Sequence, residues 1–228
     1  VIDLSDIGIQ ATQGRAYSMA VDAQGRILVA GSMVLISTGA SIGFVTRILP
    51  DGWIDPVFGI NGFYLEFGME TGVTAVGVDP SGRIWLLGRL LADGTGWWIF
   101  QLLDTGGNPT DNRALTFPGY GFETTIPTAM AFQPDGNVLL GGWGKTGSPD
   151  FFASMAVARI LGSTLNLDPT FGGSGTGELV ITDFAPAYLR SIALQPDRSI
   201  VVAGEYGLLN EENIVVTRLS PDGTLAGA

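Results

Sequence analysis

Four side chains of different chemistry stand at one equivalent place in a repeated segment of the sequence. The first copy of the segment reads AVDAQGRILVAG and covers residues 20–31. The other three copies cover residues 76–88, 131–142 and 193–204. The residues that directly follow its closing glycines are Ser32, Arg89, Trp143 and Glu205. A repeated scaffold does not require such variety, and loops on a rigid scaffold commonly carry binding sites. We therefore expect function where the repeats differ.

An aromatic ring beside hydrogen-bonding groups is typical of sites that bind a sugar or a peptide. Trp143 supplies the ring, and the loops at the ends of neighbouring strands are expected to bring polar side chains to it. The candidate ligand-binding residues are Trp143, Arg89, Glu205, Tyr188, Arg190, Tyr17 and Glu123. This set predicts a non-catalytic binding module whose partner is a glycan or a protein.

Two alternatives to a binding module stay open. A carbohydrate-active enzyme needs only two carboxyl groups beside the glycosidic bond. The same loops carry the carboxyl groups of Glu70, Glu123, Asp183 and Glu205. No spacing shows that any two of them converge, so we assign no catalytic residue. The other alternative is a purely structural spacer.

Composition excludes several classes of site. The 228 residues include neither histidine nor cysteine, which excludes disulfides, thiolate nucleophiles, Ser-His-Asp triads and His/Cys zinc sites. The net charge of −11 disfavours nucleic acid and anionic membrane surfaces. No apolar run approaches the roughly 20 residues that span a bilayer. We expect no metal, no cofactor, no nucleic-acid partner and no membrane insertion, and the oligomeric state is left open.

Charged residues also recur at equivalent positions. The arginines are Arg47, Arg159 and Arg218, and the aspartates are Asp55 and Asp168. A polar element needed in every repeat is more typical of scaffold than of a site. We expect an Arg–Asp bond that ties one strand to the loop below it, with Phe58 or Phe171 filling the end of the sheet. The second repeat departs from this pattern, with Gln101 in place of the arginine.

Short runs of apolar residues separated by turn signals predict an all-β fold. The first run of each repeat covers 17–23, 74–80, 128–134 and 190–196, and a tight turn and a second run follow it. Third runs cover 44–49, 98–103, 155–160 and 214–219. Fourth runs cover 63–67, 122–125 and 179–184.

The first runs have one bulky and one small face. In the first repeat Met19 and Val21 alternate with Ser18 and Ala20, and the other repeats keep this pattern. Such a sheet can stack on a copy of itself, bulky face against small face. Radial stacking of four-stranded sheets is a β-propeller.

We therefore predict one β-propeller domain over 1–228, made of four four-stranded blades. The blades cover approximately 12–67, 68–125, 126–184 and 185–228. The last blade has three strands, and Val1-Ile2-Asp3-Leu4 resembles the missing fourth. We predict that residues 1–5 complete the last blade, which closes the ring and removes an exposed sheet edge. A longer array or a dimeric ring remains the alternative.

The segments 46–63, 158–179 and 217–227, together with the QPDG-plus-VAG segments, resemble the delta-60 repeat of bacterial, often secreted or surface-associated proteins. The resemblance covers nearly the whole chain. It implies a propeller-like repeat domain and a secreted or cell-surface location. It implies no reaction and no catalytic residue.

Overall fold

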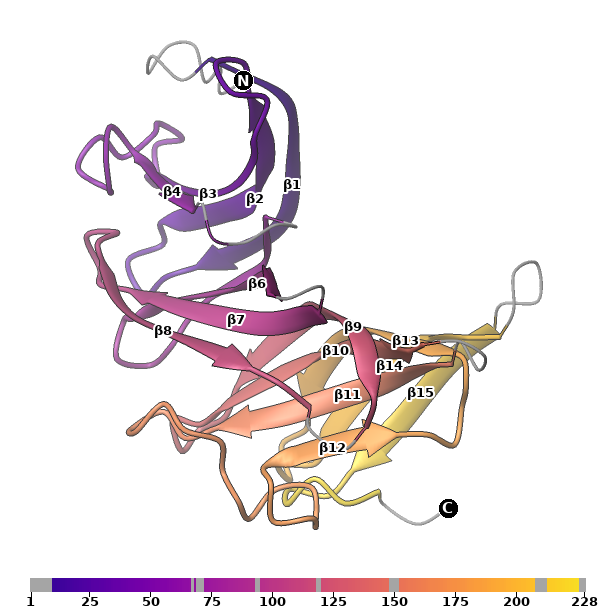
Figure 1. Ribbon diagram of the computed structural model, residues 1–228. Coiled ribbons are helices and arrows are strands. Elements are labelled where there is room, and N and C mark those ends of the chain that lie inside the picture. The colour runs from indigo at the N-terminus through magenta and orange to yellow at the C-terminus, as the bar shows by residue number, and fades with distance from the viewer. Residues whose placement is uncertain are drawn as a thin grey trace. The chain divides into compact units, whose positions relative to one another are not determined.

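Fifteen β-strands and no helix make up the described part of the computed structural model (Figure 1). The described residues are 10–66, 68, 72–92, 95–117, 120–147, 152–207 and 213–225. The strands form four antiparallel sheets. Over the described residues no helix is long and apolar enough to cross a membrane. The all-β prediction is confirmed.

The chain divides into two compact units, and unit 1 contains the first two sheets. Unit 1 extends to residue 92 and continues from 97 to 115, so the first two residues of β7 fall outside it. The first sheet consists of β1 (Ala11–Val21), β2 (Ile27–Leu35), β3 (Ser41–Ile48) and β4 (Phe63–Glu66). The second consists of β5 (Val73–Val78), β6 (Ile84–Ala92), β7 (Thr95–Leu103) and β8 (Pro109–Leu115).

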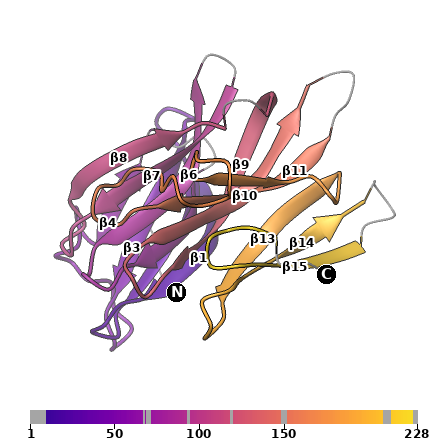
Figure 2. The same cartoon turned by 90° about the horizontal axis from the view of Figure 1, so that it is seen from below.

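Unit 2 contains the other two sheets and takes in residues 93–96 and those from 116 onward. The third sheet consists of β9 (Phe122–Phe132), β10 (Val138–Thr146), β11 (Ala153–Ile160) and β12 (Glu178–Ile181). The fourth consists of β13 (Ala187–Leu194), β14 (Ile200–Tyr206) and β15 (Asn213–Leu219). Figure 2 shows these last three strands side by side, as their register requires.

A five-residue turn joins the first two strands of every sheet. In the first sheet the N–H of Asp22 donates to the carbonyl of Arg26 at 3.0 Å, and the N–H of Gly25 donates to that of Asp22 at 3.0 Å. The fourth residue of the turn has a positive φ in every sheet: Gly25 (74°), Gly82 (87°), Gly136 (86°) and Arg198 (69°). The predicted turns are confirmed, and Arg198 is the only one of these four turn residues that is not a glycine.

A β-bulge interrupts the first strand of every sheet at one equivalent residue. The bulged residues are Tyr17, Thr74, Thr128 and Arg190. Each repeat glycine pairs with the residue just before the bulge. At Gly31 and Gly204 a Cβ would overlap the carbonyl oxygens of Arg15 and Tyr188. The closing glycine therefore makes room for the bulged strand, and a bulge re-aims the side chains beside it.

The fourth strand of the second repeat lies elsewhere than predicted. It is β8, and residues 122–125 form the start of β9 instead. The Asp104 carboxylate accepts hydrogen bonds from the N–H groups of Gly106 (2.8 Å) and Asn108 (2.9 Å). This turn returns the chain directly alongside β7, so the second sheet is complete at Leu115.

The same turn also shows which residue of the second repeat is equivalent to the arginine of the other repeats. The N–H of Asp104 donates to Asn108, just as the N–H of Leu49 donates to Trp53 in the first repeat. Arg47 stands two residues before Leu49, so its equivalent is Leu102. The prediction of Gln101 is wrong by one residue, and the buried side chain of Leu102 replaces the guanidinium.

The predicted Arg–Asp bonds are confirmed. Arg47 Nε donates to Asp55 Oδ2 at 2.8 Å, and Arg159 Nε donates to Asp168 Oδ2 at 2.7 Å. Buried rings of Phe58 and Phe171 lie under the guanidinium groups, at 4.6 and 4.8 Å from centroid to Cζ. The same arginines also reach the next sheet of their unit, through the carbonyls of Thr105 and Pro221. We call each set an arginine clamp.

Inside each unit a small face packs against a bulky face, as predicted. In unit 1 Ala20, Leu28 and Val45 share a core with residues of the second sheet. Ser18 Oγ accepts a hydrogen bond from the N–H of Val76 at 3.1 Å. In unit 2 the equivalent core joins the third and fourth sheets. At Gly141 a Cβ would overlap the side chain of Ile192, so the small face must stay small.

Residues 1–5 lie outside the described residues, so their pairing with the last sheet stays a prediction. In the described chain that sheet has three strands, β13, β14 and β15. Ring closure and the number of blades also stay predictions.

Candidate functional site

Four of the predicted residues form one cluster in unit 2. The rings of Trp143 on β10 and Tyr188 on β13 meet edge to face, with centroids 5.0 Å apart and an interplanar angle of 85°. The Arg190 guanidinium lies 6.0 Å from the centroid of the Tyr188 ring and forms an ion pair with the Glu205 carboxylate. We call these four residues the Trp143 cluster.

Strand pairing and the bulge position this cluster. Tyr188 and Glu205 are direct partners in the register of β13 and β14. Arg190 is the bulged residue two positions farther along β13. Thr128, the bulged residue of β9, donates its hydroxyl to the carbonyl of Leu189 at 2.7 Å. This bond ties the two sheets of unit 2 together next to Tyr188.

The cluster combines sheltered rings with accessible charges. Trp143 and Tyr188 are partly buried, whereas the side chains of Arg190 and Glu205 are 54% and 35% exposed. Trp143 Nε1 is buried and donates to no residue that the structure describes. A buried indole N–H usually has a partner, so this one is a donor without an acceptor in the described protein.

These groups suit a ligand that has both apolar surface and hydroxyl groups. Aromatic rings offer flat apolar area, and the ion pair offers a carboxylate acceptor beside guanidinium donors. An exposed ion pair contributes only about 0–1 kcal/mol to stability. Arg190 and Glu205 can therefore exchange their mutual hydrogen bond for bonds to a ligand at little cost to the fold.

The other three predicted residues lie outside this cluster. Tyr17 belongs to unit 1, where its hydroxyl lies 2.8 Å from Ser32 Oγ. Arg89 is on β6, also in unit 1. Glu123 is on β9 in unit 2, and its carboxylate lies against Gly147, where a Cβ would overlap it. Their roles as ligand-binding residues stay predictions, and Glu70 of the enzyme alternative lies outside the described residues.

A second aromatic pair adjoins the cluster along the chain. Phe184 packs against Tyr206, the residue after Glu205, with ring centroids 5.7 Å apart. Both rings border the hydrophobic core of unit 2. Nothing in the sequence singles out Phe184, which is one of twelve phenylalanines. Its contact supports the strand that carries Glu205.

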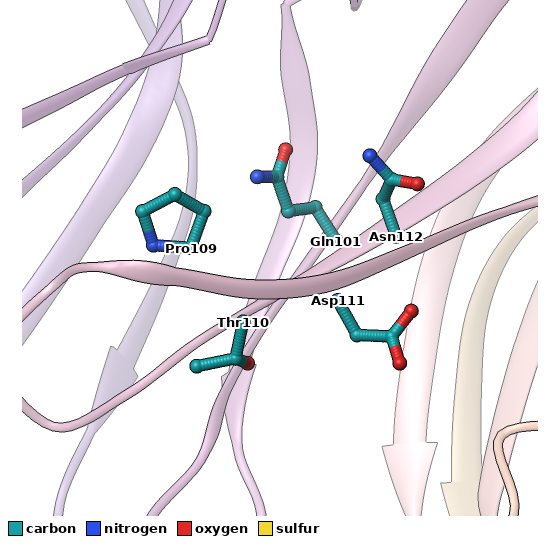
Figure 3. Close-up of a pocket in the computed structure, with 5 residues that line it drawn as sticks. All are labelled: Gln101, Pro109, Thr110, Asp111 and Asn112. Carbon is teal, nitrogen blue, oxygen red and sulfur yellow. The ribbon is translucent and has the colours of Figure 1, made fainter.

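Unit 1 contains a polar pocket of about 350 Å³ along β7 and β8. Its lining residues are Gln101, Pro109, Thr110, Asp111 and Asn112. In Figure 3 the side chains of Gln101 and Asn112 lie on one side of the β8 ribbon, and those of Thr110 and Asp111 lie on the other. The lining has no aromatic wall, so the pocket matches a sugar less well than the Trp143 cluster does.

Among the described residues no group of three or more acidic side chains is placed to hold a metal ion.

Comparison by sequence supports a propeller repeat. Residues 195–225 match the family described as "Domain of unknown function (DUF5122) beta-propeller". These residues run from the turn before β14 to the end of the described chain. No curated protein matches the sequence.

Comparison by structure covers nearly the whole chain. A mannose phosphorylase from Leishmania mexicana, in complex with phosphate, is 12% identical with a TM-score of 0.54, over 92% of this chain and 69% of that one. A PL25 ulvan lyase, a polysaccharide lyase, is 12% identical with a TM-score of 0.55, over 92% and 56%. A GH43_12 protein from a capybara gut metagenome is 12% identical with a TM-score of 0.52, over 95% and 42%.

The chain thus spans between 42% and 69% of the length of these three structures. Identities this low show a shared fold only. Together with the family match, they place the four antiparallel sheets in a fold of the β-propeller type.

Proposed function

We propose that this chain is a carbohydrate-binding propeller module of the delta-60 type, and that it holds an uncharged glycan at the Trp143 cluster. The observation that carries the proposal is the edge-to-face contact of Trp143 and Tyr188 beside the Arg190–Glu205 ion pair. It occurs where the repeats differ. The three similar structures are those of a mannose phosphorylase, a polysaccharide lyase and a GH43 protein, which supports a carbohydrate as the ligand class.

Each group has a defined part in holding a sugar. The apolar face of a pyranose ring packs against the aromatic rings, as apolar ligand surface does in most binding sites. A ring hydroxyl donates to Glu205, and Arg190 donates to a neighbouring oxygen. A ligand oxygen supplies the acceptor that Trp143 Nε1 lacks among the described residues.

The charge of the molecule favours an uncharged glycan. Arg190 and Glu205 together carry no net charge, so the cluster offers no excess positive charge to a uronate or a sulfate. The net charge of −11 also repels acidic polymers over a longer range. A secreted or cell-surface location, as the delta-60 resemblance implies, is part of the proposal.

A glycan array tests this function directly. Wild-type chain should bind a subset of neutral oligosaccharides, and Trp143→Ala should reduce that binding at least tenfold. Trp53→Ala is the matched control, because Trp53 is 75% exposed and belongs to unit 1, whereas the cluster belongs to unit 2. It should bind as the wild type does.

Two outcomes would refute the proposal. One is an array without any bound glycan. The other is equal binding by wild type and Trp143→Ala. If mass spectrometry shows that a bound oligosaccharide is cleaved during incubation with the protein, the enzyme alternative is favoured instead.

A further inference from the structure

The polar pocket of unit 1 adjoins a glutamine that stands where the other sheets have a small residue. The equivalents of Gln101 are Thr46, Ala158 and Thr217. In the first sheet the hydroxyl of Thr46 donates to the carbonyl of Gly62 at 2.9 Å, at the end of the loop over residues 49–62. In the second sheet the short turn over residues 104–108 replaces this loop. The turn has no segment equivalent to Gly62, and the pocket lies against Gln101.

A relay of hydrogen bonds orients the side-chain amide of Gln101. The N–H of Gly68 donates to Glu66 Oε1 at 2.7 Å, and the hydroxyl of Tyr64 donates to Glu66 Oε2 at 2.8 Å. Burial, and then the neighbouring carboxylate, raise the pKa of the Tyr64 hydroxyl, so it keeps its proton. A phenol has one proton to donate, so its bond with Gln101 uses an N–H of the amide. The carbonyl oxygen and the second N–H of Gln101 take no part in this relay.

Asn112 places a second amide beside that of Gln101. The two residues are direct partners in the register of β7 and β8. Their side chains lie on the same side of the β8 ribbon in Figure 3, and both residues line the pocket. Gln101 is buried, whereas Asn112 is exposed. One amide held in place and one accessible amide therefore border the same pocket.

Charge and size limit the ligand that these amides can hold. The only charged residue that lines the pocket is Asp111, whose side chain lies on the other side of the β8 ribbon and pairs with Arg113 at 3.1 Å. The two amides therefore favour an uncharged ligand. The volume of about 350 Å³ is near the lower end of the range of roughly 300–1,000 Å³ that ligand pockets cover, so the ligand is small.

We propose that the pocket along β7 and β8 is a second binding site, which holds a small uncharged ligand with adjacent hydroxyl groups, either an open-chain polyol or a single sugar ring. Each hydroxyl both donates and accepts, so two neighbouring hydroxyls match the donor and acceptor groups of the two amides. The site holds its ligand through hydrogen bonds, without the aromatic rings of the Trp143 cluster. Its residues belong to unit 1, so the site does not depend on the proposed function.

NMR of the side-chain amides tests this site. The chain is labelled with nitrogen-15 at asparagine and glutamine, and Gln101→Met and Asn112→Leu identify two of the resonance pairs. One arm of the titration uses sorbitol, an open-chain polyol, and the other uses methyl glucoside, a single sugar ring. The resonances of Gln101 and Asn112 should shift and saturate in at least one arm. The arm that saturates identifies the source of the hydroxyl groups. The resonances of Asn166, which is exposed in unit 2, should stay unchanged.

Variants supply the second measurement. Asn112→Leu should weaken the binding reported by Gln101 by about fivefold or more, because its hydrogen bonds to the ligand are lost. Asn166→Leu is the matched control and should bind as the wild type does. Because Asn112 is exposed, its variant should keep the circular dichroism of the wild type. Trp143→Ala should keep the shifts, which separates this test from that of the proposed function.

Two results would overturn this second site. One is that the resonances of Gln101 and Asn112 stay unmoved in both arms. The other is equal affinity of the wild type and Asn112→Leu for the compound that shifts them.

Discussion

Arg198 has a φ of 69° at the turn position where the other three sheets have glycine. A side chain in the left-handed region costs about 1–2 kcal/mol, although a glycine there loses more entropy on folding. Arg198→Gly should therefore raise the free energy of unfolding by about 0.5–1 kcal/mol. Urea denaturation checks this, with Gly136→Ala as the reverse change. A lower urea midpoint for Arg198→Gly would show that its side chain stabilises the turn in another way.

Glu178 makes stability depend on pH. It is 2% exposed, and its Oε2 accepts no hydrogen bond from any described residue. Burial raises the pKa of this carboxyl from 4.5 to about 7. The unfolded chain ionises it at the lower pH, so stability falls as pH rises from about 4.5 to 7 and stays lower above.

Substitution of Glu178 tests that dependence. Between pH 5 and pH 8 the free energy of unfolding of the wild type should fall by about 2–3 kcal/mol, because the pKa of Glu178 differs between the folded and unfolded chain. The free energy of unfolding of Glu178→Gln should not show this fall. The measurement is the free energy of unfolding in urea at both pH values. Equal pH dependence of the two proteins would show that the carboxyl ionises as readily in the fold as outside it.

At the scale of elements, the arginine clamps connect consecutive sheets of a unit. Arg159→Met should destabilise the chain by about 3 kcal/mol, because it leaves the buried Asp168 carboxylate without its cation. Arg113→Met is the matched control. Arg113 pairs with Asp111 at 3.1 Å with 47% of its side chain exposed, and its loss should cost less than about 1 kcal/mol. Similar urea midpoints for Arg159→Met and Arg113→Met would show that the arginine clamp does not stabilise the fold.

Most elements could be predicted from the sequence because turn chemistry and alternation recur in each repeat. The exception is β8, whose sequence PTDNRAL has little apolar alternation because most of its side chains are exposed. The Asp104 turn, and not the side-chain pattern, determines where this strand pairs. Residues 122–125, which the sequence analysis predicts as the fourth strand of the second repeat, extend β9 instead.

At the scale of the whole molecule, the repeats identify equivalent positions but not the compact units. Trp143, Tyr188, Arg190 and Glu205 come together because they lie on consecutive sheets of unit 2. Tyr17 and Arg89 occupy equivalent places but belong to unit 1. The boundary follows the second repeat, where Leu102 replaces the clamp arginine and no Asp-Pro-x-Phe-Gly segment occurs. Sequence equivalence alone could not reveal this division.

Fluorine NMR of the five tryptophans tests the central claim, that a glycan binds at the Trp143 cluster. The chain is labelled with 5-fluorotryptophan, and Trp143→Phe and Trp53→Phe identify two of the resonances. Titration with the oligosaccharide selected by the array should shift the Trp143 resonance and leave that of Trp53 unchanged. An unmoved Trp143 resonance at saturating oligosaccharide would contradict the account.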